Sequence, residues 1–79
     1  MTHLRFHIRF PEGNIREPIL YQVGREYHVV TDIRRADVRE TIGWADVELS
    51  GDTVEIERAI AGLRAKGCGV DPIELNVVE

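Results

Sequence analysis

The stretch 44–67, WADVELSGDTVEIERAIAGLRAKG, decides the fold, because it holds a strand, a helix start, a helix and a helix end in direct succession. From Trp44 to Leu49, apolar residues alternate with Asp46 and Glu48. A period of two is typical of a strand that is buried on one face only. This segment therefore predicts a strand with one core face and one solvent face.

The second half of the stretch predicts a helix over 52–66. Asp52 suits the N-cap position, and Glu55 three residues later completes the pattern of a capping box. One apolar stripe runs along the predicted helix: Ile56, Ala59, Ile60 and Leu63. Gly62 indicates close packing against the helix, and Gly67 suits a C-terminal cap.

The remaining elements lie on either side of this stretch. Apolar and basic residues alternate over 3–10, which predicts the first strand. A helix is predicted over 17–27, with Pro18 in its first turn, and a strand over 28–38. The last strand is predicted over 70–77, and its Pro72 lacks an N–H, which places it at a sheet edge.

The order β-α-β-β-α-β predicts one α+β domain over 1–79 with a ferredoxin-like fold. We expect a four-stranded antiparallel sheet with two helices on one face. The first and third strands are then central neighbours, the second strand is an edge, and the other face of the sheet is open.

Two interpretations of that open face follow from its side chains. The first strand presents a basic row, and the third strand presents a row with Trp44 and two acids; the first row is His3, Arg5, His7 and Arg9. Adjacent rows of opposite charge predict a self-neutralising solvated face. The second interpretation is a partner-binding face with Trp44 as the interface anchor.

Composition limits the function classes. The chain has 79 residues and a net charge of −4, which argues against binding nucleic acid or a membrane surface through bulk charge. The open strands lack the aromatic platform of RNA-recognition domains, and the loop after the first strand has too few glycines for an acylphosphatase. We see no catalytic constellation, metal site or cofactor motif. One cysteine, Cys68, and no apolar run of membrane length fit a cytoplasmic protein.

The chain resembles the NIL domain over nearly its whole length. Three segments carry the resemblance: EPILYQVGREY as the first helix, DIRRADV at the motif that names the family, and ADVELSGDTVEIERAIAGLRAKGCGVDPIE as the last three elements. The resemblance implies an ACT-like, ferredoxin-like fold, dimers, and binding of methionine in methionine-import transporters. We expect the free-standing form, because neither an ATPase nor cluster cysteines accompany the domain here.

The resemblance places a ligand site along the second strand, with the ligand-binding residues Asp32, Ile33, Arg34, Arg35 and Ala36. The family's Asn-Ile-Leu aligns with Asp32, Ile33 and Arg34, so only Ile33 matches. An Asp carboxylate lacks the N–H donors of the Asn amide. Arg34 or Arg35 suits a ligand carboxylate and Asp32 an ammonium group. The edge position suggests that a second chain completes the site. The alternative is that these charges only protect the free edge of the sheet against aggregation.

We therefore expect a small non-enzymatic regulatory domain that senses an amino-acid-like ligand of methionine or sulfur metabolism. The alternative is a protein-interaction adaptor that docks on a sulfur-metabolism enzyme or ferredoxin and binds no metabolite. Small size, the open face and the resemblance predict a homodimer.

Overall fold

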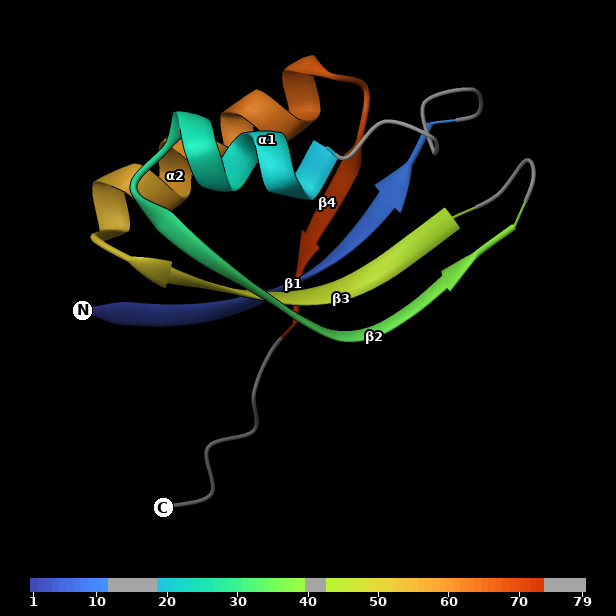
Figure 1. Cartoon of the computed structure of the whole chain (residues 1–79), viewed down its shortest axis with the longest axis horizontal. Helices are drawn as coiled ribbons and strands as arrows, with labels where there is room; N and C mark the ends of the chain where they lie inside the picture. The colour runs from blue at the N-terminus through green and yellow to red at the C-terminus, as the bar shows by residue number, and fades with distance from the viewer. Residues whose placement is uncertain (12–18, 40–42, 74–79) are drawn as a thin grey trace.

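The computed structural model describes residues 1–11, 19–39 and 43–73, and they form one antiparallel sheet with two helices on the same face (Figure 1). The elements follow in this order: β1 Thr2–Phe10, α1 Ile19–Glu26, β2 Val29–Val38, β3 Gly43–Gly51, α2 Thr53–Ala65 and β4 Gly69–Pro72. The strand order β2-β3-β1-β4 puts β1 and β3 in the centre. The predicted ferredoxin-like fold is confirmed.

The register between β1 and β3 sorts side chains onto the two faces of the sheet. Phe6 pairs with Val47 and Ile8 with Ala45, and all four are buried beneath the helices. Between and beside them, polar residues pair on the other face, His7 with Asp46 and Arg5 with Glu48. The alternation in the sequence therefore assigned the core face of both central strands correctly.

The core lies between the sheet and the two helices. Helix α1 contributes Ile19 and Val23, and α2 contributes Ile56, Ala59 and Leu63, all at most 2% exposed. Burying each aliphatic side chain of this size contributes about 1.5–3 kcal/mol relative to leaving it in water. The apolar stripe of 52–66 is thus the surface that fixes α2 to the sheet. Within the described ranges, neither helix has the length and apolar character needed to cross a membrane.

The start of α2 differs from the predicted capping box. Asp52 occupies the N-cap position, but its side chain makes no capping hydrogen bond. The Glu55 carboxylate accepts from the His28 backbone N–H at 3.2 Å and pairs with Arg58 at 2.8 Å. Glu55 therefore ties α2 to the start of β2 rather than to its own N-cap, because His28 precedes β2 directly beside this turn.

The end of α2 is as predicted. Gly67 has φ +91°, in the left-handed region that favours glycine. The Gly67 N–H donates to the Arg64 carbonyl and the Cys68 N–H to the Leu63 carbonyl, both at 3.0 Å, which is a Schellman cap. The cap turns the chain into β4.

Strand β4 is an edge strand that pairs with β1 as far as Pro72, which agrees with the position predicted for that proline. The strand was predicted over 70–77, and it starts at Gly69, one residue earlier. Residues 74–77 lie outside the described residues, as does Pro18 of the predicted first helix.

Candidate functional site

A β-bulge in β2 creates the candidate site. Ile33 pairs with Val47 but Arg35 pairs with Asp46, so Arg34 is an extra residue in the strand. Such an insertion breaks the alternation of side chains and re-aims the strand. As a result, Arg34 and Arg35 both reach acidic residues on the open face, whereas Ile33 lies on the helix-covered face, opposite Val47.

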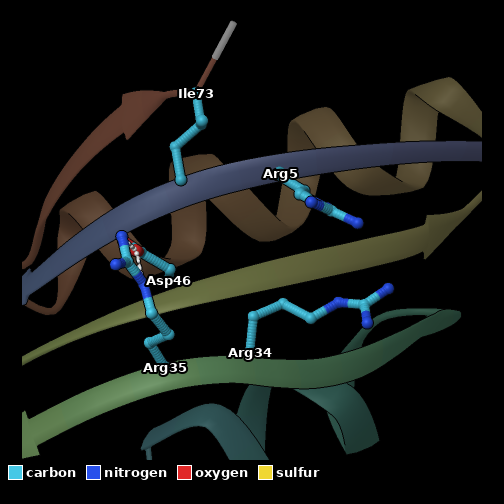
Figure 2. A pocket seen from close by; sticks show the side chains of 5 residues that line it. All are labelled: Arg5, Arg34, Arg35, Asp46 and Ile73. Atoms are coloured by element: carbon cyan, nitrogen blue, oxygen red, sulfur yellow. Dashed lines mark hydrogen bonds and ion pairs between the residues drawn. The ribbon is translucent and has the colours of Figure 1, made fainter. Parts of the chain in front are cut away.

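The bulge gives rise to a pocket on the open face of the sheet. Three strands and the residue that follows β4 line it. The lining residues are Arg5 of β1, Arg34 and Arg35 of β2, Asp46 of β3, and Ile73. Figure 2 shows Arg34 and Arg35 rising from β2, with the Arg35 guanidinium at Asp46 and with Ile73 at the opposite side of the pocket. A volume of about 310 Å³ lies at the lower end of the range for small-molecule sites and suits a ligand of amino-acid size.

Asp46 is the central acceptor of the pocket. It is only 7% exposed, and its two oxygens have different partners. Oδ1 accepts from His7 Nδ1 at 2.7 Å, and Oδ2 accepts from Arg35 Nη2 at 2.8 Å and Nε at 3.2 Å. The hydrogen bond from His7, aided by Arg35, holds the pKa of Asp46 below its usual range. Asp46 is therefore an ionised, nearly buried group that fixes the position of Arg35.

Glu48 has the same function for the other two arginines. Its Oε1 accepts from Arg5 Nε at 3.2 Å, and Arg34 Nη2 lies 3.5 Å from the same oxygen. The hydrogen bond from Arg5 and the charge of Arg34 lower the pKa of Glu48. Arg34 Nε also lies 3.5 Å from Asp32 Oδ2. Three guanidinium groups thus converge on the pocket, each oriented by a carboxylate.

Arg35 is the lining residue best placed for a ligand. Its side chain is 76% exposed, and its hydrogen bonds to other described residues go to Asp46 alone. A guanidinium has five N–H donors in a fixed plane, and two of them are used here. The other three donors have no partner among the described residues, and donors of this kind suit a carboxylate or a similar anion.

The structure brings two of the five predicted ligand-binding residues into the pocket, Arg34 and Arg35. Asp32 lies on the open face opposite Glu48, beside the pocket, and Ile33 and Ala36 lie on the other face of the sheet, opposite Val47 and Ala45. Ligand binding by all five residues stays a prediction.

Sequence reasoning did not assign Arg5, Asp46 or Ile73 to the site. Arg5 and Asp46 already stood in the facing rows of the two central strands. They could have been found by combining two predictions: that the polar rows of the first and third strands face each other, and that the second strand lies next to the third.

The rows of the open face pair as the first interpretation predicted. His7 lies opposite Asp46 and Arg5 opposite Glu48, each pair joined by a hydrogen bond. Next to them, Trp44 is half-buried and its ring stacks on His7, with ring centroids 5.3 Å apart. The role of Trp44 at an interface stays a prediction.

Two further kinds of site, a reactive thiol and a metal centre, are not supported among the described residues. Cys68 is buried, and this burial raises the pKa of its thiol, which makes it a poor nucleophile. Within residues 1–11, 19–39 and 43–73, no three His, Cys, Asp or Glu side chains are grouped to hold a metal ion.

The comparisons with known proteins agree with this architecture. The family model described as the NIL domain matches residues 4–72. The solved C-terminal domain of an ABC transporter ATP-binding protein from Enterococcus faecalis superposes with a TM-score of 0.78 and 24% sequence identity, over 89% of this chain and 82% of that one. At that identity the likeness shows the fold alone. No curated protein matches this sequence.

Proposed function

This chain belongs to the NIL domain family, and from that membership we propose that it is a non-enzymatic regulatory domain that binds a small amino-acid-like ligand on the open face of its sheet. The observation that carries the proposal is the bulge in β2, which directs Arg34 and Arg35 into one pocket with Arg5. A bulge next to a pocket re-aims side chains that strict alternation would place on opposite faces.

The chemistry of the pocket supports a zwitterionic ligand with an apolar side chain. A ligand carboxylate accepts hydrogen bonds from the outer donors of Arg35 and from Arg34. The ammonium group is held by Asp32, which lies beside the pocket on the same face. The ligand side chain packs on Ile73. Methionine and its metabolic relatives have this chemistry, and the family link to methionine transport supports that choice.

The second candidate is an adaptor domain without a metabolite ligand. The observation that favours it is the mutual pairing of the open face, where Asp46 and Glu48 already bind the arginines of the pocket. Trp44, half-buried at the end of that face, then serves as the anchor of a protein interface. In either case we place the domain in the cytoplasm and expect it to act as a homodimer.

Calorimetric titration with methionine, homocysteine and S-adenosylmethionine tests the two candidates. We expect one of them to bind the wild-type chain, and Arg34→Ala or Arg35→Ala to weaken binding by about tenfold or more, because hydrogen bonds to charged groups contribute about 1.5–3 kcal/mol. Arg25→Ala is the matched control, since Arg25 lies on α1, which packs on the opposite face of the sheet, and should bind as the wild type does. No binding by any of the three would favour the adaptor.

A further inference from the structure

Asp46 divides its carboxylate between two cations, and only one of them belongs to the proposed ligand site. Arg35 lines the pocket, whereas His7 does not. Both are bound at short distance, 2.8 Å for Arg35 Nη2 and 2.7 Å for His7 Nδ1. Because Asp46 is 7% exposed, water is a poor substitute for either partner. The strength of one bond therefore affects the other.

The protonation state of His7 sets the strength of its bond to Asp46. An ionised carboxylate only accepts hydrogen bonds, so the His7 ring donates from Nδ1 whether it is neutral or charged. Titration then adds or removes the proton at Nε2. A charged imidazolium makes a charge-assisted bond that is about twice as strong as the neutral one. Asp46 stays ionised in this range, because its pKa is lowered.

The other charged groups near His7 are paired among themselves. They are Arg5 and Arg9 on β1, Glu48 on β3, Asp71 on β4 and Arg34 on β2. Arg5 and Arg34 bind Glu48, and Arg9 binds Asp71, which lies opposite His7 in the register with β4. Among these described groups, Arg35 is the one that shares the Asp46 carboxylate with His7, and its side chain is 76% exposed to a ligand.

We propose that anion binding in the pocket is linked to protonation of His7 through Asp46, so that a ligand carboxylate binds more tightly when His7 is charged. A charged His7 contributes to the neutralisation of Asp46, so more of the positive charge of Arg35 acts on a ligand at its outer donors. A neutral His7 leaves Arg35 as the only full positive charge on Asp46, which weakens its attraction for the ligand. This inference rests on the proposed function, which supplies the ligand, and it adds that pH regulates ligand binding.

Linkage makes the effect reciprocal, so ligand binding also favours the charged form of His7. This is measurable because Trp44, the only tryptophan of the chain, stacks on His7 and its fluorescence responds to a charge on that ring. The fluorescence of the ligand-free protein should show a transition with pH as His7 gains or loses its proton. His7→Gln should abolish this transition, which distinguishes His7 from His3 and His28.

The first arm of the experiment needs no ligand. Arg35→Gln removes a positive charge near Asp46 and should move the fluorescence midpoint to higher pH. Asp46→Asn removes the negative charge and should move it to lower pH. Arg25→Gln on α1 is the control and should leave it unchanged. Arg35 is exposed, so its replacement tests the coupling even if the Asp46 variant fails to fold. A midpoint that is the same in the wild type and in Arg35→Gln overturns the inference.

The second arm adds methionine, or acetate as the simplest carboxylate, at about pH 5.5 and about pH 7.5. Wild-type affinity should be about fivefold higher at the lower pH, within the usual range of coupling between two sites. His7→Gln should bind equally at both. Wild-type binding that is equal at both pH values overturns this inference and leaves the proposed function intact. Absence of binding by acetate and by all three of methionine, homocysteine and S-adenosylmethionine at both values overturns the two together.

Discussion

At the scale of the residue, the glycines of the two helices, Gly62 in α2 and Gly24 in α1, differ in how tightly they are packed. The Tyr27 ring lies directly on Gly62 of α2, and a Cβ built there would stand 2.9 Å from two ring carbons. Gly24 of α1 has room for a methyl group, since a Cβ there would meet its nearest neighbour, the Val29 carbonyl oxygen, at an ordinary contact distance of 3.8 Å. Only the first glycine is required by packing.

We predict opposite effects for alanine at these two positions. Gly62→Ala should destabilise the fold by about 1–3 kcal/mol, because Tyr27 must leave its place in an already packed interface. Gly24→Ala should stabilise it by up to about 1 kcal/mol, the difference in helix propensity. Urea unfolding of both variants measures this. Equal effects of the same sign would show that the contact of Tyr27 does not decide the outcome.

The lowered carboxyl pKa values predict acid sensitivity. The pKa of Asp46, Glu48 and Glu55 lies below the ordinary values of 3.8 for Asp and 4.5 for Glu. The unfolded chain then takes up protons first as the pH falls, so their contribution to stability is complete above the ordinary values and is lost below them. Thermal melts from pH 7 to pH 3 should show a steep fall below about pH 4.5, and a shallower one for Asp46→Asn. A flat profile would contradict the ion pairs.

At the scale of the element, the two ends of α2 are stabilised in different ways. Asp52 makes no capping bond with its side chain, whereas Gly67 supplies a left-handed residue that closes a Schellman cap. Asp52→Ala should therefore cost less than the roughly 1 kcal/mol typical of an N-cap, and Gly67→Ala about 1 kcal/mol from backbone strain. A Cβ on Gly67 would meet Pro11 only at ordinary distance, 3.5 Å, so packing adds little. Chemical unfolding measures the loss of stability in each variant. A larger loss for Asp52→Ala than for Gly67→Ala would show that the Asp52 side chain does cap the helix.

The sequence predicted the regular elements and missed the irregular one. Alternation in β1 and the apolar stripe of α2 depend on each segment's own periodicity, so local patterns were sufficient. The bulge in β2 depends on how Arg34 and Arg35 meet Asp46 and Glu48 on β3, and a single strand's sequence does not contain that register. The capping box failed for a similar reason, because His28 competes for Glu55 from another part of the chain.

At the scale of the whole molecule, the two edges of the sheet differ. The described part of β4 is four residues long and ends in Pro72, whereas β2 has ten residues along its edge. Apolar side chains on the helix side of β2 are also exposed, Ile33 at 54% and Val38 at 57%. A long edge with exposed apolar residues is a template for pairing with another strand. If the chain pairs with a second copy, we therefore expect the contact at β2.

Charge then selects one register for an antiparallel β2–β2 pair. In one register that keeps like faces together, Asp32 lies opposite Arg35 of the second copy and Val29 opposite Val38. A shift of two residues sets Asp32 opposite Asp37 and Arg34 opposite Arg35, which is repulsive. The first register joins opposite charges twice, because a two-fold axis repeats each contact. It also brings Asp32 of one copy to Arg35 of the other, at the mouth of the proposed ligand pocket.

Charge reversal tests this dimer without reference to any ligand. We predict that the wild-type chain is dimeric at micromolar concentration, and that Asp32→Arg and Arg35→Asp each weaken the dimer, because both variants place like charges opposite each other twice. A mixture of the two variants should recover dimers, since both pairs between positions 32 and 35 then join an acid to a base. Sedimentation velocity measures each state, with Arg25→Asp on α1 as a control that should stay dimeric. A mixture that stays monomeric would exclude this register, and a monomeric wild type would exclude the dimer itself.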